Sequence, residues 1–570
     1  MRYFALACDY DGTLALHGVV DENTVEALQR LKTSGRKLLL VTGRELEDLL
    51  QVFPQTSMFD MVVAENGGLL YRPDTREIRQ LSSSPPPQLI ELLRRKQVTP
   101  LSIGRVIVAT REPYETVVLQ AIHELGLEYQ IIFNKDAVMV LPSGVNKATG
   151  LKAALKELGL SRHNVAAVGD AENDHAMLDF CEFSAAVANA LPSLKEHVDW
   201  VTPADHGAGV TELIDRLIEE ETQKLEPRPG RGEVVLGVSA DGREVRLPAY
   251  GSSILLAGTS GGGKSSLVTG FVERLLDGGY QVCIFDPEGD YPELERTIVM
   301  GDSQRVPARE EVMRALEKPN ASVVVNLTGL NLDDRPRYFQ RLLPDVLELR
   351  TRNGRPHWVI VDEAHHVMPV SWKPSVEIVP PVLKGLLLVT VHPDHVSPSL
   401  LRSVDLVMAV GKTPEATFSE FAKAINRAKP EVDSAALDSG DALGWRVQDD
   451  GRPFRFRAIP ARSVRRRHVR KYMEGELPPE RNFYFRGPEN KLQLRAQNLQ
   501  MFLQLADGVD HDTWMHHLHQ QHYSRWFREM IKDESLAAAA EVVERTPGLS
   551  PEESKNRVRS AIEERYTAAE

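Results

Sequence analysis

The middle of the 570-residue chain reads Ile254-Leu255-Leu256-Ala257-Gly258-Thr259-Ser260-Gly261-Gly262-Gly263-Lys264-Ser265. The apolar run predicts a strand, the glycines predict a tight turn, and the apolar stripe that begins at Leu267 and Phe271 predicts a helix. Backbone N–H groups of such a turn, with the positive N-terminus of the helix, bind the phosphates of a nucleotide. We expect Lys264 to supply the cation and Ser265 a hydroxyl for Mg²⁺. The predicted ATP-binding residues are Gly258, Gly261, Gly263, Lys264 and Ser265.

A second apolar run, Trp358 to Val361, ends at two adjacent carboxylates, Asp362 and Glu363. We expect Asp362 to join the Mg²⁺ shell and Glu363 to orient the attacking water. The pair favours hydrolysis over kinase chemistry, because a kinase keeps water away from the γ-phosphate.

The middle third of the chain resembles the HerA/FtsK class of P-loop ATPases over roughly residues 230 to 460. The similarity rests on Gly258 to Ser265, on Asp286-Pro287-Glu288-Gly289-Asp290-Tyr291 and on Asp362-Glu363-Ala364-His365. In that class a later strand ends in Thr-Gln-Arg-Pro, and its Gln senses the γ-phosphate. Here the strand ends in Thr390-Val391-His392-Pro393, which contains no Gln. Either His392 takes over the role of that Gln, or the site hydrolyses ATP slowly. The resemblance also implies a ring hexamer or other homo-oligomer, and nucleic acid as a partner.

The first strand of the chain, Tyr3 to Cys8, leads into Asp9-Tyr10-Asp11-Gly12-Thr13. Two carboxylates at this spacing allow one to attack phosphorus while the other moves protons. Further polar motifs follow predicted strands or open a helix, at Thr42-Gly43-Arg44, Lys147 and Gly169-Asp170-Ala171-Glu172-Asn173-Asp174. Their order resembles the haloacid dehalogenase (HAD) superfamily, subfamily IIB, which is Cof-like with a C2 cap.

That resemblance implies a parallel sheet with its active site at the carboxyl edge. Asp9 would be the nucleophile that forms an aspartyl-phosphate, and Asp11 the general acid and base. Thr42 and Lys147 would hold the phosphate. The implied Mg²⁺ ligands are Asp9, the carbonyl of Asp11, Asp170 and Asp174.

A small α+β cap is expected at about residues 83–142, between the Thr42 and Lys147 motifs. The pattern predicts helices at 89–95 and 114–125 and strands at 105–109 and 130–141. Caps exclude water and select the substrate. A cap this small admits either a small phosphorylated metabolite or a protruding phosphate on a larger molecule.

The predicted fold class is α/β and multidomain. It comprises a Rossmann-like HAD sheet with its cap, a P-loop α/β domain and a C-terminal helical module. Pro and Gly predict a linker after the first domain. The expected boundaries are 1–220 for the HAD-like domain, 221–232 for the linker, 233–461 for the ATPase, 462–480 for a basic connector and 481–570 for the helical module.

The role of several charged and histidine residues outside these motifs is open. The connector, with Arg462, Arg465 to Arg467, Arg470 and Lys471, either contacts phosphates or is a solvated segment. The histidines between His511 and His522 are expected on a surface helix rather than at a metal. Candidate arginine fingers, most of them expected to be ordinary surface residues, are Arg335, Arg337, Arg341, Arg350, Arg352 and Arg402.

The net charge of −13 argues against a generally basic nucleic-acid coat. The three cysteines, Cys8, Cys181 and Cys283, are expected to be buried free thiols in a reducing compartment. The chain starts directly with a predicted strand and has no apolar run of membrane-spanning length, so we expect no membrane association and a cytoplasmic location.

These observations leave four functions open. The first is a bifunctional Mg²⁺-dependent phosphatase and ATPase acting on a phosphorylated substrate of unknown identity. The others are an ATP-driven nucleic-acid translocase with an accessory phosphatase, a nucleotide-gated regulator of the phosphatase, and a polynucleotide kinase-phosphatase. The Asp362-Glu363 pair weakens the last of these.

Overall fold

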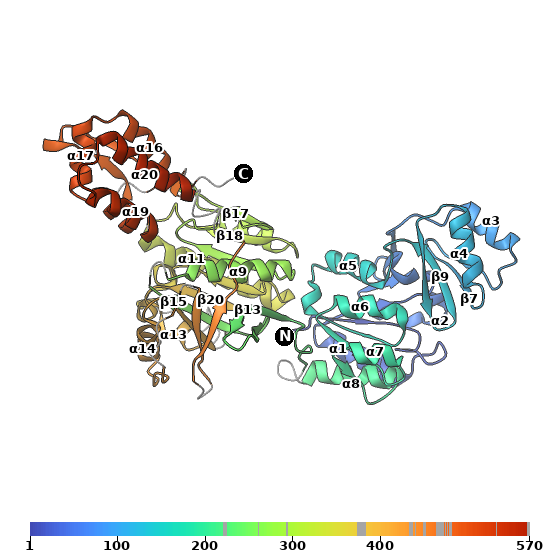
Figure 1. Ribbon diagram of the computed structural model, residues 1–570. Helices are drawn as coiled ribbons and strands as arrows, with labels where there is room; N and C mark the ends of the chain where they lie inside the picture. Colours follow the sequence, from blue (N-terminus) through green and yellow to red (C-terminus); the bar gives the residue numbers. More distant parts are fainter. Residues whose placement is uncertain are drawn as a thin grey trace.

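The computed structural model places three units along the chain (Figure 1). The first is drawn in blue to teal, the second in green to orange, and the third, in red, lies beyond the second. The described residues are 1–219, 225–259, 262–291, 294–372, 383–432, 437–438, 440–448, 452–462, 472–473, 475, 477, 481–531 and 533–566.

The first unit is built on an eight-stranded sheet in the order β12-β11-β10-β1-β2-β3-β4-β5. Its strands are parallel from β12 to β3, and the last two are antiparallel. β1 lies between β10 and β2, so the segments after these three strands meet at one edge. The strands are β1 (Ala5–Cys8), β2 (Lys37–Val41), β3 (Met61–Ala64), β4 (Leu69–Arg72), β5 (Glu77–Gln80), β10 (Val165–Gly169), β11 (Phe183–Ala186) and β12 (Trp200–Val201).

Six helices accompany this sheet. α5 begins with a capping box, in which Asn146 accepts from Thr149 and Thr149 accepts from Asn146, and it ends at Gly159 with φ of 67°. The helices are α1 (Glu22–Thr33), α2 (Leu46–Val52), α5 (Lys147–Leu158), α6 (His175–Phe180), α7 (Pro192–His197) and α8 (His206–Glu219).

The cap lies at the end of the first unit that is remote from the second (Figure 1). Its sheet has the order β6-β7-β9-β8, with α3 (Pro87–Arg95) and α4 (Glu115–Glu124) alongside. The strand expected at 130–141 is in fact a hairpin that turns at Lys135 and Asp136. The cap strands are β6 (Ser102–Ile103), β7 (Val108–Arg111), β8 (Tyr129–Asn134) and β9 (Ala137–Pro142).

The second unit has an eleven-stranded sheet in the order β14-β13-β23-β22-β21-β15-β20-β19-β16-β18-β17. The strands from β21 to β17 are parallel, and the remainder pair antiparallel. The strands are β13 (Glu233–Ser239), β14 (Glu244–Pro248), β15 (Ser253–Gly258), β16 (Val282–Asp286), β17 (Thr297–Met300), β18 (Ser322–Asn326), β19 (Trp358–Val361), β20 (Leu386–Thr390), β21 (Leu406–Val410), β22 (Asp441–Arg446) and β23 (Phe454–Ala458).

Separate apolar cores fill the two sides of this second sheet. Leu255 and Phe285 contribute to one core, whereas Ile254 and Phe271 contribute to the other. Alternation of side chains along each buried strand produces this division. The helices are α9 (Lys264–Asp277), α10 (Arg309–Leu316), α11 (Arg335–Asn353), α12 (Ala364–Val367), α13 (Pro398–Leu401) and α14 (Pro414–Ala424).

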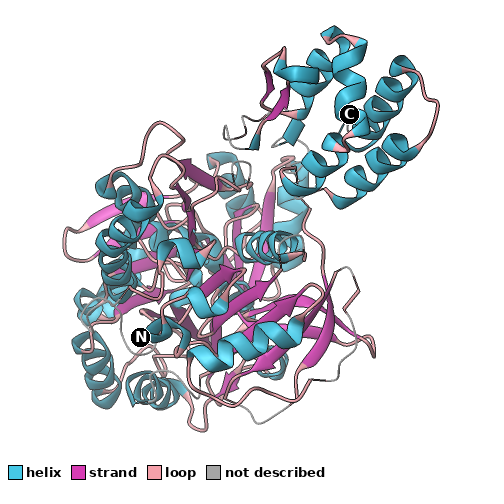
Figure 2. Ribbon diagram, turned by 90° about the vertical axis from the view of Figure 1, so that its left-hand side faces the viewer, coloured by secondary structure: helices cyan, strands magenta, loops and turns pink. Residues whose placement is uncertain are grey.

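The third unit is a helical bundle with a two-stranded hairpin, set apart from the strand-rich body (Figure 2). Aromatic rings fill its core, among them Phe502, Trp514 and Tyr523. His517 departs from the expected surface position, because it is buried and its Nδ1 lies 2.9 Å from Nδ1 of His522. The elements are β24 (Phe483–Phe485), β25 (Leu494–Ala496), α16 (Leu499–Gly508), α17 (His511–His519), α18 (His522–Glu529), α19 (Glu534–Arg545) and α20 (Pro551–Tyr566).

The predicted fold class is confirmed by this α/β, multidomain architecture. All three cysteines are buried and free, as expected. Of the helices described, none has the length and hydropathy needed to cross a bilayer. Most of the basic connector, residues 463–471, lies outside the described residues.

Candidate active sites

Three buried carboxylates meet at the carboxyl edge of the first sheet. Asp9 follows β1, Asp170 follows β10, and Asp174 lies one short turn further on. Oxygens of all three lie within 4.8 Å of one another. The ammonium of Lys147, the first residue of α5, donates to Asp174 Oδ1 at 2.6 Å and also to Asp9 Oδ1.

The charges of this cluster do not balance. Burial raises the pKa of Asp9 well above its usual value, Asp174 raises it further, and Lys147 opposes both. Burial also raises the pKa of Asp170. Burial alone would lower the pKa of Lys147, but the carboxylates of Asp174 and Asp9 raise it. Three convergent carboxylate oxygens with excess negative charge fit a hard divalent cation such as Mg²⁺.

Asp11, expected as acid and base, lies outside the three-carboxylate cluster. Its carboxylate is held by Arg44, whose Nε and Nη2 donate at 2.7 Å to the two oxygens. Any contribution of Asp11 to a metal shell therefore comes from its backbone carbonyl. Thr42 is buried at the end of β2, and its hydroxyl accepts from the N–H of Arg44 at 3.1 Å.

The cap reaches this cluster through a residue that the sequence did not single out. Lys135, at the tip of the β8–β9 hairpin, donates from Nζ to Asp170 Oδ2 at 2.8 Å. Glu65, between β3 and β4, binds the cap from the other side, because its buried carboxylate accepts the N–H groups of Arg105, Val106 and Ile107 at 2.7 to 3.1 Å. The cap is thus held over the carboxylates.

The glycine-rich turn of the second unit connects β15 to α9 as expected. Gly258 has φ of 149°, and a side chain there would overlap the carbonyl oxygen of Val410 on β21. Gly263 has φ of 96° and precedes Lys264, whose Nζ donates to the carbonyls of Gly258 and Thr259 at 2.8 and 3.1 Å. Ser265 lies exposed in the first turn of α9, and Gly261 is outside the described residues.

Two neighbouring strands of this sheet end in aspartates. Asp362 follows β19, and Asp286 is the last residue of β16 beside it. Burial, together with the carboxylates of Asp290 and Asp362, raises the pKa of Asp286 to about 7. Glu363 adopts a left-handed conformation with φ of 40°, which re-aims its side chain relative to the strand.

Strand β20 lies between β15 and β19, so the segment after it borders both the turn and the carboxylate pair. The hydroxyl of Thr390, the last residue of β20, lies 3.0 Å from Nδ1 of His365. Burial, together with smaller contributions from neighbouring histidines, lowers the pKa of His365 to about 4. His392, the candidate substitute for the missing Gln, is exposed just beyond Thr390.

One arginine-finger candidate has a structural role inside its own chain. Arg350 donates to the carbonyls of Pro356 and Lys384 at 2.8 and 2.6 Å. Its guanidinium therefore braces the start of β19 and the segment before β20.

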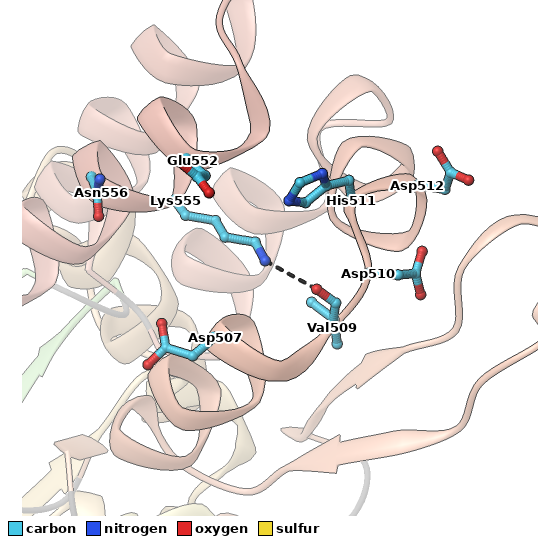
Figure 3. Close-up of a pocket in the computed structure, with 8 residues that line it drawn as sticks. All are labelled: Asp507, Val509, Asp510, His511, Asp512, Glu552, Lys555 and Asn556. Atoms are coloured by element: carbon cyan, nitrogen blue, oxygen red, sulfur yellow. Dashed lines mark hydrogen bonds between the residues drawn. The ribbon is translucent and has the colours of Figure 1, made fainter.

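The third unit holds a pocket between α16, α17 and α20 (Figure 3). The Nζ of Lys555, one of its lining residues, donates to the carbonyl of Val509 at 3.0 Å. Four carboxylates among the lining residues make the pocket a poor match for phosphate groups. The lining residues are Asp507, Val509, Asp510, His511, Asp512, Glu552, Lys555 and Asn556.

The first two units meet through buried polar contacts. The carbonyl of Gly278, just past α9, accepts from Arg162 at 2.6 Å and lies 2.8 Å from Nε2 of His163. The His163 ring stacks on Tyr280 at 3.7 Å, and the Tyr280 hydroxyl donates to Glu182 at 3.2 Å. Both ring nitrogens of His163 face oxygen atoms, since Nδ1 lies 2.8 Å from Glu182 Oε2.

A capped parallel sheet with Asp9, Asp170, Asp174 and Lys147 at its carboxyl edge defines a hydrolase unit, here joined to a P-loop ATPase unit. A family model described as haloacid dehalogenase-like hydrolase matches residues 6–114 and 99–214. Helicase HerA, central domain, matches residues 244–348. The chain belongs to the haloacid dehalogenase-like hydrolase family and carries a HerA-type central domain in the same polypeptide.

Among curated relatives, phosphoglycolate phosphatase of Methanothermobacter thermautotrophicus is 31% identical over 223 residues, covering 38% of this chain and 98% of the relative. Phosphoglycolate phosphatase 2 of Saccharolobus solfataricus is 31% identical over 225 residues, covering 37% and 91%. A solved haloacid dehalogenase-like hydrolase from Bacteroides thetaiotaomicron is 20% identical with a TM-score of 0.33, covering 38% of this chain and all of that one.

Proposed function

We propose that the first unit is a Mg²⁺-dependent phosphomonoester hydrolase that works through an aspartyl-phosphate on Asp9. The observation that carries this proposal is the cluster of Asp9, Asp170 and Asp174 around Lys147. Mg²⁺ held by these carboxylates would neutralise charge on the phosphate, and Lys147 and Thr42 would orient it.

In the first step the Asp9 oxygen bonds to phosphorus while the ester oxygen leaves and takes a proton from Asp11. In the second step Asp11 removes a proton from water and the water oxygen bonds to phosphorus. The bond between phosphorus and the Asp9 oxygen breaks, which releases phosphate and restores the Asp9 carboxylate. Arg44 holds the Asp11 carboxylate in place through hydrogen bonds of 2.7 Å to both of its oxygens.

A small anionic substrate fits the cap best. Lys135 brings an ammonium from the cap to the carboxylate edge, where it could meet a second acidic group of the substrate. Two curated relatives named as phosphoglycolate phosphatases support this chemistry. Phosphoglycolate is therefore the first substrate to test.

For the second unit we propose ATP binding and hydrolysis. Lys264 would hold the phosphates, Ser265 and Asp362 would hold Mg²⁺, and Glu363 would orient water. Nucleic-acid translocation, with a ring hexamer, stays a second proposal that rests on the HerA-type match alone. A polynucleotide kinase-phosphatase is a weaker alternative, because Glu363 beside Asp362 favours hydrolysis.

The contact between the units favours one further role, nucleotide gating of the phosphatase. α9 begins at Lys264 and ends beside Gly278, which contacts Arg162 and His163 of the first unit. A change in nucleotide state at one end of α9 would therefore act on the phosphatase at the other end.

The experiment is phosphate release with Mg²⁺ from phosphoglycolate and, separately, from ATP. Wild type, Asp9→Asn and Glu363→Gln are compared with and without DNA. We expect Asp9→Asn to lose only the first activity and Glu363→Gln only the second. Full phosphoglycolate turnover by Asp9→Asn would overturn the nucleophile assignment, and stimulation of ATP turnover by DNA would favour the translocase.

A further inference from the structure

Three ligand-type side chains gather beyond the end of β20, outside both sites already described. His392 follows the strand, Asp394 lies in the short 3-10 helix Pro393–His395, and Glu420 projects from α14. Each offers an atom within 4.8 Å of the other two. The ring of His395 lies 4.8 Å from that of His392, which places a second imidazole beside the group.

The backbone beneath these side chains is fixed. Pro393 is buried, and the N–H groups of His395 and Val396 donate to His392 and Pro393 carbonyls at 3.1 and 3.2 Å. This turn packs against α14, which carries Glu420. Two packed elements thus hold the three side chains, and rigid support of this kind favours a metal site.

Within the part of the chain that the structure describes, no hydrogen bond or ion pair engages the side chains of His392, Asp394 or Glu420. Asp394 and Glu420 face each other as like charges, an arrangement that a bound cation relieves.

The donor set differs from that of the Asp9 cluster. Carboxylates alone suit Mg²⁺, whereas imidazole together with carboxylate suits divalent transition metals such as Zn²⁺. We propose that His392, Asp394 and Glu420 bind one divalent transition-metal ion of the Zn²⁺ class, with His395 available as a fourth ligand.

The position of this metal site connects it to the ATPase carboxylates. Nδ1 of His365 is 3.6 Å from Glu363 and 3.0 Å from the hydroxyl of Thr390. That hydroxyl in turn contacts the backbone of His392 at 3.1 and 3.2 Å. A metal that fixes His392 therefore fixes a short contact chain ending at Glu363. This consequence rests on the proposed ATPase, but metal binding itself does not.

The test is calorimetric titration of the full-length protein with Zn²⁺ in excess Mg²⁺, which occupies the all-oxygen sites. Wild type is compared with His392→Ala, Asp394→Asn and Glu420→Gln, and with His519→Ala as a control that removes an exposed histidine in the third unit. Circular dichroism verifies that each variant is folded. The titration contains no ATP, so failure of the ATPase proposal does not affect the result.

We expect each of the three site variants to lose one bound Zn²⁺ per chain, or to bind it with much lower affinity. The loss in affinity should exceed the roughly 10- to 100-fold that is typical when a residue hydrogen-bonded to a metal ligand is removed. His519→Ala should keep the wild-type stoichiometry. With Co²⁺ as probe, the visible absorption of wild type should be lost in His392→Ala. Wild-type Zn²⁺ binding in all three site variants would overturn the proposal.

Discussion

Nη2 of Arg355 in the second unit donates a hydrogen bond of 2.6 Å to the carbonyl oxygen of Gly159 in the first unit. Gly159 caps the end of α5, whose first residue is Lys147 at the phosphatase cluster. Arg355 precedes β19, the strand that delivers Asp362 and Glu363. One hydrogen bond therefore joins the two elements that lead to the two candidate sites.

Replacement of Arg355 by Met should uncouple the units. The side chain is buried, and besides Gly159 it donates to Gln281 and Leu316 at 2.9 and 3.1 Å, so the loss should lower the free energy of unfolding by about 2 kcal/mol. Any effect of ATP on phosphoglycolate turnover should disappear. Thermal unfolding and turnover with and without ATP measure both effects. Arg314→Met, at an exposed arginine of α10, is the control. An unchanged ATP response in Arg355→Met would contradict the coupling.

Acidification should weaken the same interface through His357. This buried ring accepts from the N–H of Gln281 at 2.8 Å and lies 3.3 Å from Asn164 of the first unit. Burial, with smaller contributions from His163 and Arg355, lowers the pKa of His357 well below 6.5. The unfolded chain therefore binds more protons below pH 6.5, and stability is lost as the pH falls through this range.

His357→Gln keeps a polar side chain at this position without the titration. Between about pH 7 and about pH 5, thermal unfolding of wild type should lose more stability than that of His357→Gln. His123→Gln, at an exposed histidine of α4, should behave as wild type. Parallel pH profiles for wild type and His357→Gln would show that His357 does not set this dependence.

Lys135 should affect both substrate and metal affinity. Its ammonium occupies Asp170 Oδ2, so Lys135→Met should strengthen Mg²⁺ binding and raise KM for an anionic substrate by about 10-fold or more, with a smaller change in kcat. Lys135→Arg should restore most of the affinity. Lys152→Met, at an exposed lysine of α5, serves as control. If Lys135 had only a structural role, Lys135→Met would change neither KM nor the Mg²⁺ requirement selectively.

The sequence predicted the strands and the carboxylates at their ends, because both depend on the local pattern of apolar and polar residues. Asp9 and Asp362 each follow a short apolar run, and such runs form strands whose ends meet at one edge. The β8–β9 hairpin was missed because its turn, with Lys135 at φ of 53°, has none of the Gly or Asn residues that mark tight hairpins. The contact of Arg355 with the first unit could not be predicted for another reason, since its partner Gly159 lies 196 residues away in the sequence.

Glu363→Gln should separate ATP binding from hydrolysis. The substitution keeps the volume and the left-handed backbone position but removes the carboxylate that would accept a proton from water. ATP affinity should stay near wild type while phosphate release falls roughly 10²-fold or more. Binding is measured with a fluorescent ATP analogue and release under single turnover. Lys264→Ala should instead lose binding, because its ammonium is the cation at the turn. Glu415→Gln, at an exposed glutamate paired with Lys429, is the matched control. Wild-type hydrolysis by Glu363→Gln would assign the water-orienting role to another group, and His365, whose Nδ1 lies 3.6 Å from Glu363, would be the next residue to replace.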